Sequence, residues 1–193
     1  SREAAMLRHD AIRAILERVK DEPIISNLGG TTFHLHNLSD RDANLYTWGA
    51  MGLSSSIGLG VALAAPNRKV IVMDGDGSLL MNLGSLGTIA RQNPSNLIHI
   101  VWDNHQWAGT GGQPTHTAGV SDLAAIARGS GIPKVESVST LESLEEIFDR
   151  AMTEQGPWCI VADVEGGDQP VRPEVSIEEH LQRFRKTFRE DNY

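Results

Sequence analysis

Two polar side chains, each placed directly after an apolar run, have the types and spacing needed to bind a divalent cation. Asp76 lies between two glycines in the segment Asp74–Ser78 (DGDGS), which overlaps the end of the apolar run Lys69–Asp74 (KVIVMD). Asn104 stands 28 residues later, just after a second apolar run, Leu97–Trp102 (LIHIVW). Carboxylate and amide oxygens are ligands that suit Mg²⁺, and phosphate oxygens could complete the same site.

The elements that must position these two residues are two buried parallel strands joined by a helix. Continuous apolar runs such as 69–74 and 97–102 are typical of strands buried on both faces of a parallel sheet. The helical pattern between them, at 79–93, makes a strand–helix–strand crossover. The carboxyl ends of both strands should therefore lie at one edge of the sheet, where open α/β sheets bind ligands. We expect Asp76 and Asn104 to converge there on one ion.

The glycines on either side of Asp76 indicate a site for a diphosphate. Gly75 and Gly77 allow a sharp turn and a close approach of the backbone to a ligand. Free amides at the start of the following helix, from about Gly77 and Ser78, suit phosphate oxygens, and for Ser78 we expect the amide to matter more than the hydroxyl. The alternative for Asp76 is a turn residue that caps a helix, and for Asn104 alone it is a loop amide.

The remaining pattern predicts one α/β domain, a three-layer α/β/α arrangement with a mostly parallel sheet. Further strands are expected at 23–26, 46–48, 134–138 and 158–164. Helices are expected before residue 23 and at 53–65, 122–128, 141–152 and 177–189. We assign residues 1–193 to this single domain, with a tail helix from about residue 175. A Gly-rich loop is expected at 105–119, and a linker-like stretch at 165–173.

The composition of the chain argues against several classes of protein. The chain carries 25 acidic and 17 basic residues, which gives a formal net charge of −8. This balance argues against a nucleic-acid surface but not against an anionic cofactor, since backbone amides and a metal neutralise phosphate locally. The single cysteine, Cys159, excludes a disulfide framework and favours a reducing, cytoplasmic location. No apolar run reaches the length of a membrane span.

Gly-Asp-Gly followed about two dozen residues later by an Asn-containing pair resembles the signature of thiamine diphosphate enzymes. The resemblance implies thiamine diphosphate and Mg²⁺ as cofactors. It also implies that the metal is bound by Asp76, Asn104 and the main-chain carbonyl of Gln106. The position of the motif identifies this chain as the diphosphate-binding domain of such an enzyme.

The upstream segment Trp48–Gly52 (WGAMG) extends the resemblance. In related decarboxylases and acetohydroxyacid synthases, the residue matching Gly49 accepts a hydrogen bond from the 4′-amino group of the cofactor. The residue matching Met51 wedges between the two cofactor rings and enforces their bent arrangement, for which a polarizable, adaptable side chain is suitable. The alternative for Met51 is a plain core residue. The cofactor contacts predicted in this way are Gly29, Gly30, Thr31, Gly49, Met51, Gly75, Asp76, Gly77, Ser78, Asn104, Gln106 and Trp107.

Within the family, the likeness is to the phosphonopyruvate and sulfopyruvate decarboxylases, and it covers roughly residues 21–165. It is carried by the segments Asn27–Gly30, Gly49–Gly60, Gly75–Ala90 and Thr110–Thr115. A chain with the diphosphate half alone is similar to the β subunit of the split sulfopyruvate enzyme. The implied reaction is attack of the cofactor carbanion on the carbonyl of a 2-oxo acid, followed by loss of CO₂ and protonation to an aldehyde.

The resemblance also implies a partner. The glutamate that faces the aminopyrimidine ring comes in this family from a pyrimidine-binding domain, and no second α/β domain is expected here. We therefore expect an α-type, pyrimidine-domain subunit to complete the active site, and the isolated chain to be inactive. No Arg or Lys lies in Thr110–Thr115, so the charge that binds an anionic substrate head is expected from the partner or from the remote Arg41.

The roles of several further residues stay open. Thr31 could touch phosphate or substrate, with a hydroxyl-lined turn as an equal alternative. His105 and Trp107 could face the reacting centre or simply pack in their loop. His34 and His36 alternate at strand spacing and are interpreted as a surface edge, because two histidines without a third ligand seldom bind metal.

Thr110 and Gln113 could shape a mobile lid over the substrate.

Three other functions compete with a decarboxylase. A carboligase of the acetolactate synthase type would share the cofactor site and differ only in residues that the sequence does not place. An oxoacid–ferredoxin oxidoreductase β subunit would need cluster-binding cysteines, which one cysteine cannot supply. A non-catalytic, receiver-like binding module could use Asp74 or Asp76 as a phosphate acceptor, but Lys134 precedes its strand, where such a module needs a lysine after one.

Overall fold

A computed structural model describes residues 5–165 and 170–188; part of the linker-like stretch, 166–169, lies outside the described residues. The described part of the chain contains a six-stranded parallel sheet with the order β2-β1-β3-β4-β8-β7. Its strands are β1 (Ile24–Ser26), β2 (Asn44–Tyr46), β3 (Val70–Gly75), β4 (Leu97–Asp103), β7 (Lys134–Val138) and β8 (Trp158–Asp163). A short antiparallel ribbon follows β4 and pairs β5 (Gln106–Trp107) with β6 (Gln113–Pro114).

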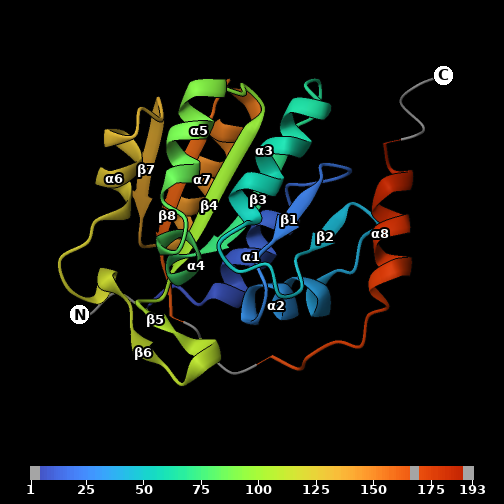
Figure 1. The fold of residues 1–193 in the computed structure, drawn as a ribbon, viewed down its shortest axis with the longest axis horizontal. Helices are drawn as coiled ribbons and strands as arrows, with labels where there is room; N and C mark the ends of the chain where they lie inside the picture. The colour runs from blue at the N-terminus through green and yellow to red at the C-terminus, as the bar shows by residue number, and fades with distance from the viewer. Residues whose placement is uncertain (1–4, 166–169, 189–193) are drawn as a thin grey trace.

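Helices cover both faces of the sheet, which confirms the predicted three-layer α/β/α arrangement (Figure 1). They are α1 (Arg8–Leu16), α2 (Gly30–Leu38), α3 (Ser54–Ala64), α4 (Asp76–Leu80), α5 (Gly84–Gln92), α6 (Leu123–Gly129), α7 (Leu141–Thr153) and α8 (Ile177–Lys186). None of the helices in the described ranges has the length and apolar character needed to cross a membrane.

Alternate residues of the central strands supply two hydrophobic cores, one on each face of the sheet. Ile71 and Met73 of β3 pack on the side of α1, α2 and α7, whereas Val70 and Val72 pack on the side of α3, α5 and α6. Successive side chains of a strand point to opposite faces, so a strand that is apolar at nearly every position is buried on both sides. This is why continuous apolar runs predicted these strands correctly.

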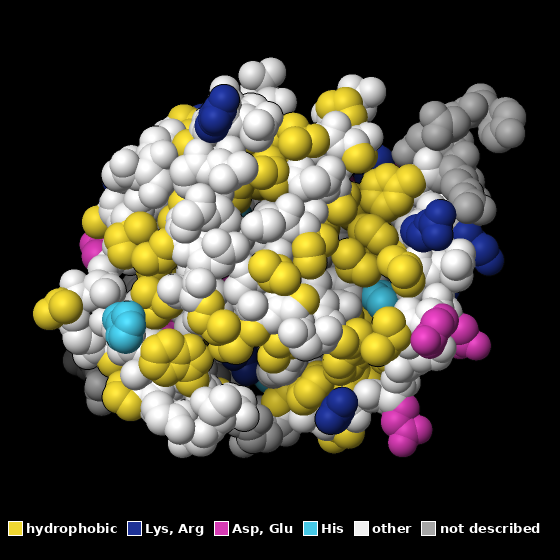
Figure 2. Space-filling model, in the orientation of Figure 1, with side chains coloured by type: hydrophobic (Ala, Val, Ile, Leu, Met, Phe, Trp, Pro, Cys, Tyr) yellow, Lys and Arg dark blue, Asp and Glu magenta, His cyan; other side chains and the backbone are white. Residues whose placement is uncertain are grey.

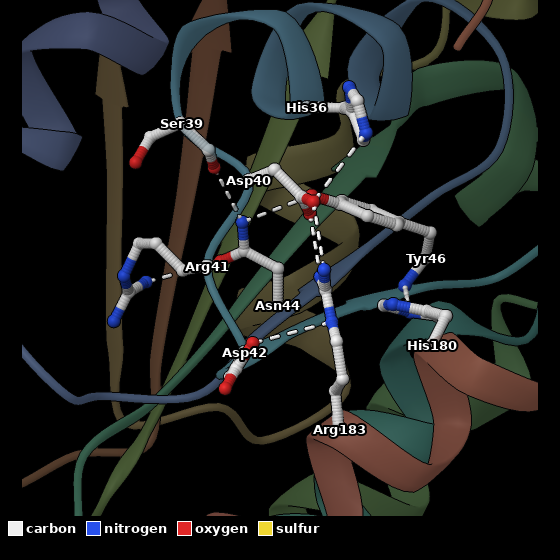
Figure 3. A network of polar contacts seen from close by, with 9 residues as sticks. All are labelled: His36, Ser39, Asp40, Arg41, Asp42, Asn44, Tyr46, His180 and Arg183. Atoms are coloured by element: carbon white, nitrogen blue, oxygen red, sulfur yellow. Dashed lines mark hydrogen bonds and ion pairs between the residues drawn. The ribbon is translucent and has the colours of Figure 1, made fainter. Parts of the chain in front are cut away.

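The C-terminal helix α8 covers the edge strand β2 (Figures 1 and 3). The backbone amide of Tyr46 donates a 2.9 Å hydrogen bond to Nε2 of His180, whose ring stacks on that of Tyr46 with centroids 4.6 Å apart. Arg183 donates two hydrogen bonds, of 3.0 and 2.8 Å, to the carboxylate of Asp40. The helix therefore packs on the sheet and protects a strand edge that could otherwise pair with another chain.

Two elements differ from the sequence prediction in their limits. The helix predicted at 79–93 is divided into α4 and α5, and α4 already begins at Asp76. Between them, Nδ2 of Asn82 donates a 3.0 Å hydrogen bond to the carbonyl of Gly52, a tertiary contact that local periodicity cannot reveal. The strand predicted at 46–48 is found at Asn44–Tyr46, where it pairs with β1.

His34 and His36 lie on the helix α2, so their interpretation as a surface strand edge is wrong. His34 is buried, and its ring centroid lies 5.6 Å from that of His9. The segment GTTFHLHNL contains β-branched, aromatic and histidine residues of weak helix propensity, and its alternation resembles a strand. Packing of the helix on the sheet overrides that local preference.

Candidate active site

The neighbouring strands β3 and β4 bring the predicted metal ligands together. They pair in parallel with Gly75 opposite Trp102, so both chains leave the sheet side by side at its carboxyl edge. One terminal atom of the Asn104 amide lies 3.1 Å from Oδ1 of Asp76 and 3.0 Å from the carbonyl oxygen of Gln106. The amide of Asn104 therefore contacts both of the other predicted metal ligands.

The orientation of the Asn104 amide decides what this contact means chemically. With its nitrogen facing inward, Asn104 donates hydrogen bonds to Asp76 and Gln106. With its oxygen facing inward, that oxygen meets the oxygens of Asp76 and Gln106 without a hydrogen between them, which only a cation would stabilise. Two of these three ligands are an amide oxygen and a main-chain oxygen, so the site is not a cluster of acidic, histidine or cysteine side chains. The described residues contain no group of three or more His, Cys, Asp or Glu that could hold a metal ion.

His105 provides the turn that lets Asn104 and Gln106 face the same point. Its φ of 60° lies in the left-handed region, which is uncommon for a residue other than glycine and is often found at functional sites. The turn is held from both sides: the His105 amide donates to Oδ1 of Asp103 (3.1 Å), and its carbonyl accepts from the Thr115 amide (3.0 Å).

The side chain of His105 is directed away from this turn. Its ring nitrogens lie 3.0 Å from Oγ1 of Thr117 and 3.1 Å from Oδ1 of Asp163. Burial opposes the protonated ring, but the carboxylates of Asp103 and Asp163 outweigh burial and raise the pKa of His105. The ring does not line the pocket described below, so this placement favours the loop-packing alternative for His105.

Asp76 is buried, and its second carboxylate oxygen is held by the loop that follows β4. Oγ1 of Thr115 donates a 2.6 Å hydrogen bond to Oδ2 of Asp76. Burial, together with the nearby charge of Asp103, raises the pKa of Asp76 to about 6, although the hydrogen bond from Thr115 acts in the opposite direction. Oδ1 is left facing Asn104. The sequence analysis gave Thr115 no role of its own and missed this inward one.

The predicted lid residues Thr110 and Gln113 are exposed at the turn between β5 and β6. Oγ1 of Thr110 donates a 2.9 Å hydrogen bond to Oε1 of Gln113, so the two side chains contact each other. Thr110 lines the pocket, and Gln113 does not. A lid function for this turn stays a prediction.

A pocket opens beside the Asp76–Asn104 contact, at the carboxyl edge of the sheet. Every cofactor contact predicted from the sequence lines it except Gly49. The lining residues that were not among the predicted cofactor contacts are Arg8, Asn27, Leu28, Trp102, Ala108, Gly109 and Thr110. Arg8 lies far from the Gly-Asp-Gly motif in the sequence, and no local signal links it to the motif.

Two helices begin at this pocket with free backbone amides. α2 starts at Gly30 after Gly29, which has a φ of 74°, and α4 starts at Asp76 after Gly75; neither helix has a side-chain cap at its N-terminus. Such ends are natural anion-binding positions. Thr31, at the start of α2, is buried and lines the same pocket.

The Met51 segment is tied to α4 by side-chain hydrogen bonds. Gly52 donates its amide to Oγ of Ser78 at 3.0 Å and accepts the bond from Asn82 at its carbonyl. The hydroxyl of Ser78 thus holds the segment, a role that the sequence analysis did not foresee. Met51 itself is half-buried and lines the pocket, which disfavours the plain-core alternative. Gly49, with a φ of 71°, lies at the turn that precedes it.

Trp107 covers the start of α4. A β-carbon placed on Gly77 would lie 2.3 Å from Nε1 of Trp107, so the indole packs directly on the glycine backbone. The same indole makes an edge contact with the ring of His116, with centroids 5.7 Å apart. Gly77 is therefore required for this close packing.

A buried ion pair lies one residue before the Gly-Asp-Gly motif. Nε2 of His99 on β4 is 3.0 Å from Oδ2 of Asp74 on β3, and both residues are buried. Burial favours the neutral forms of both groups. The interaction with His99 nevertheless lowers the pKa of Asp74, and the interactions with Asp74 and Cys159 raise the pKa of His99 to about 10. Oδ1 of Asp74 accepts the amide of Gly75 at 2.9 Å, which fixes the start of the turn.

The family follows from comparison of this chain with known proteins. Residues 29–162 match the model of the thiamine pyrophosphate enzyme, C-terminal TPP-binding domain. This region extends from the start of α2 to the end of β8 and includes Asp76, Asn104 and Gln106. The chain belongs to this family, as the Gly-Asp-Gly motif predicted.

Curated relatives are similar over most of the chain. The β subunit of sulfopyruvate decarboxylase from Methanocaldococcus jannaschii is 46% identical over 156 residues, which cover 80% of this chain and 82% of that subunit. Phosphonopyruvate decarboxylase from Streptomyces viridochromogenes is 40% identical over 175 residues, which cover 90% of this chain and 44% of that protein. The chain thus spans most of the first relative and less than half of the second.

A solved structure shares the fold. The X-ray structure of a protein described as a thiamin diphosphate-dependent enzyme, from Mycobacterium smegmatis, superposes with a TM-score of 0.72 at 20% sequence identity. The match covers 84% of this chain and 32% of that one, so the present fold corresponds to one part of a longer chain.

Proposed function

We propose that this chain is the diphosphate-binding subunit of a thiamine diphosphate- and Mg²⁺-dependent decarboxylase. Its substrate would be a small 2-oxo acid with an anionic head group, of the sulfopyruvate or phosphonopyruvate type. The observation that carries the proposal is the contact of Asp76, Asn104 and Gln106 beside a pocket lined by the remaining predicted cofactor contacts. The similarity to sulfopyruvate decarboxylase β subunits supports both the reaction and the role as a subunit.

The donor set fits Mg²⁺. Asp76 and Gln106 offer a carboxylate and a main-chain oxygen, each within hydrogen-bonding distance of the Asn104 amide. Mg²⁺ prefers oxygen ligands in an octahedron of about six, so about three positions would be left for phosphate oxygens and water. Thr115 fixes the unused oxygen of Asp76 and so orients the carboxylate toward the ion.

Different pocket residues would contact different parts of the cofactor. The amides of Gly77 and Ser78 and the uncapped start of α2 would bind the diphosphate, and Trp107 would exclude water from it. Met51 would support the bent arrangement of the rings, with the Gly49 carbonyl accepting a hydrogen bond from the 4′-amino group. When bound, thiamine diphosphate supplies the carbanion and the electron sink that loss of CO₂ requires.

A pyrimidine-domain subunit would complete the site with its glutamate. Figure 2 shows hydrophobic side chains spread over the face that carries α3, α4 and α5, with acidic side chains at its margins. Leu53 and Met81 are 48% and 60% exposed, and both adjoin Gly52 in the segment that carries Met51. Interface cores are depleted in charge and more apolar than the rest of a protein surface. We place the partner on this face.

Co-purification of the chain with a pyrimidine-domain subunit, followed by a screen of 2-oxo acids for CO₂ release, tests the function. We expect the pair to decarboxylate sulfopyruvate or phosphonopyruvate and the isolated chain to be inactive. Acetolactate formation from pyruvate without release of an aldehyde would support the carboligase alternative. Robust turnover by the isolated chain would contradict the shared site.

A further inference from the structure

Arg8 is a buried cation on the wall of the pocket. Arg8 is 8% exposed, and its Nε is buried without a hydrogen-bond partner. No carboxylate among residues 5–165 and 170–188 forms an ion pair with its guanidinium. Burial lowers the pKa of Arg8, against the charge of Asp76, but arginine remains protonated in proteins. A buried charge without a partner is costly, so its presence calls for an explanation.

The start of α1 and the end of β8 together place Arg8 at the carboxyl edge of the sheet. Leu7 forms a parallel bridge with Glu165, just beyond the end of β8. The Arg8 amide donates to the Glu165 carbonyl at 3.0 Å, and the Glu165 amide donates to the Met6 carbonyl at 2.9 Å. α1 therefore begins at the edge where Asp76 and Asn104 meet, and its first side chain lines their pocket.

The guanidinium lies against the start of α2. A β-carbon placed on Gly30 would lie 2.3 Å from Nη2 of Arg8, so only glycine leaves room for the guanidinium at this position. Gly30 is the first residue of α2, and the helix has no side-chain cap. A helix N-terminus carries a partial positive charge and repels a cation. An arginine held against one, with no carboxylate between them, indicates a position for an anion that contacts both.

We propose that Arg8 binds the terminal phosphate of the cofactor diphosphate, together with the N-terminal amides of α2. This inference rests on the proposed function. The ion bound by Asp76 and Asn104 would neutralise the diphosphate from one side, and Arg8 from another. The anionic head of the substrate would have the same chemistry, but the substrate must react where two subunits meet. Arg8 is buried within this chain, beside the glycines that the diphosphate approaches, which favours the cofactor as the source of the anion.

Calorimetric titration of the full chain with inorganic pyrophosphate and Mg²⁺ tests the proposal without any need for activity. We expect Arg8→Gln to weaken binding about 10-fold to 100-fold, as the loss of a charge-assisted contact does, and Arg8→Lys to restore part of it. Arg13→Gln is the matched control, because Arg13 is exposed on the same helix and its loss changes net charge equally. It should bind pyrophosphate within about twofold of the wild type.

Thermal unfolding separates a binding role from a structural one. Without ligand, Arg8→Gln should unfold at the same temperature as the wild type or higher, since it removes an unpaired buried charge. With Mg²⁺ and pyrophosphate present, its gain in unfolding temperature should be smaller than that of the wild type. A lower unfolding temperature without ligand, and an equal gain with it, would show that Arg8 is structural.

Two further comparisons distinguish the possible failures. If Asp76→Ala abolishes pyrophosphate binding while Arg8→Gln leaves it unchanged, the inference on Arg8 is wrong and the proposed function stands. If the wild-type chain does not bind pyrophosphate with Mg²⁺, both are wrong. If Arg8→Gln weakens only the binding of methylphosphonate or ethanesulfonate to the cofactor-loaded complex, Arg8 serves the substrate head and the proposal is overturned.

Discussion

The hydroxyl of Thr115 donates a 2.6 Å hydrogen bond to Oδ2 of Asp76, which leaves Oδ1 of that carboxylate facing Asn104. Groups that orient a metal ligand affect metal affinity although they do not touch the ion. We predict that Thr115→Val weakens Mg²⁺ binding about 10-fold to 100-fold, measured by titration of Mg²⁺ at saturating pyrophosphate. Thr115→Ser keeps the hydroxyl and is the control. Equal Mg²⁺ affinity in both variants would remove this role from Thr115.

The contact between Gly77 and Trp107 predicts a steric coupling. Gly77→Ala would place a β-carbon 2.3 Å from Nε1 of Trp107, so the indole must move away from the pocket. We expect a loss of about 1–3 kcal/mol in the free energy of unfolding and a change in tryptophan fluorescence. In the double variant Gly77→Ala/Trp107→Ala, the second substitution should relieve the first. Additive losses in unfolding free energy would show that the two residues are independent.

The attachment of α8 to the sheet predicts a dependence of stability on pH. Nε2 of His180 accepts the amide of Tyr46, which requires a neutral ring, and burial together with Arg183 lowers the pKa of His180 (Figure 3). Below the unfolded-state pKa of about 6.5, the unfolded chain binds a proton that the folded chain resists. The contribution of His180 is therefore fully present above that pH and is lost as the pH falls through the folded pKa.

Unfolding temperatures measured from pH 8 to pH 5 test this direction of the pH dependence. The loss of stability should begin only below a pH of about 6.5. His180→Gln keeps an acceptor but does not titrate, so its unfolding temperature should fall less on acidification. Identical slopes in the two proteins would assign the pH dependence to other groups.

The buried pair of His99 and Asp74 predicts strong non-additivity. His99→Leu would leave the Asp74 carboxylate buried without its cation, at a cost of about 3–5 kcal/mol in the free energy of unfolding. The double variant Asp74→Asn/His99→Leu removes both charges and keeps an acceptor for the Gly75 amide. Chemical denaturation should show the double variant to be more stable than His99→Leu. A less stable double variant would contradict the assignment of an ion pair.

Much of the site could be predicted from the sequence, because patterns over short stretches of the chain determine where Asp76 and Asn104 lie. The apolar runs before Asp76 and Asn104 define parallel strands, and the crossover between them brings their ends to one edge of the sheet. The fold followed from these elements, and the family from the resemblance of the Gly-Asp-Gly motif and its spacing to a known signature.

Contacts that depend on tertiary packing could not be predicted in the same way. Arg8 reaches the pocket through a bridge to Glu165, at the other end of the described domain. Thr115 lies in a loop whose side-chain directions depend on the turn at His105. His34 was misread because α2 forms through packing on the sheet in spite of its local propensity. Each of these requires the positions of elements that are distant in the sequence.

The most direct measurement of the central claim is calorimetric binding of thiamine diphosphate to the chain, with and without Mg²⁺, for the wild type and for Asp76→Ala. The account predicts binding that requires Mg²⁺ in the wild type and is abolished by the substitution, because the Asp76 carboxylate contacts Asn104 where the ion would lie. Binding that is independent of Mg²⁺, or that survives in Asp76→Ala with unchanged affinity, would contradict it.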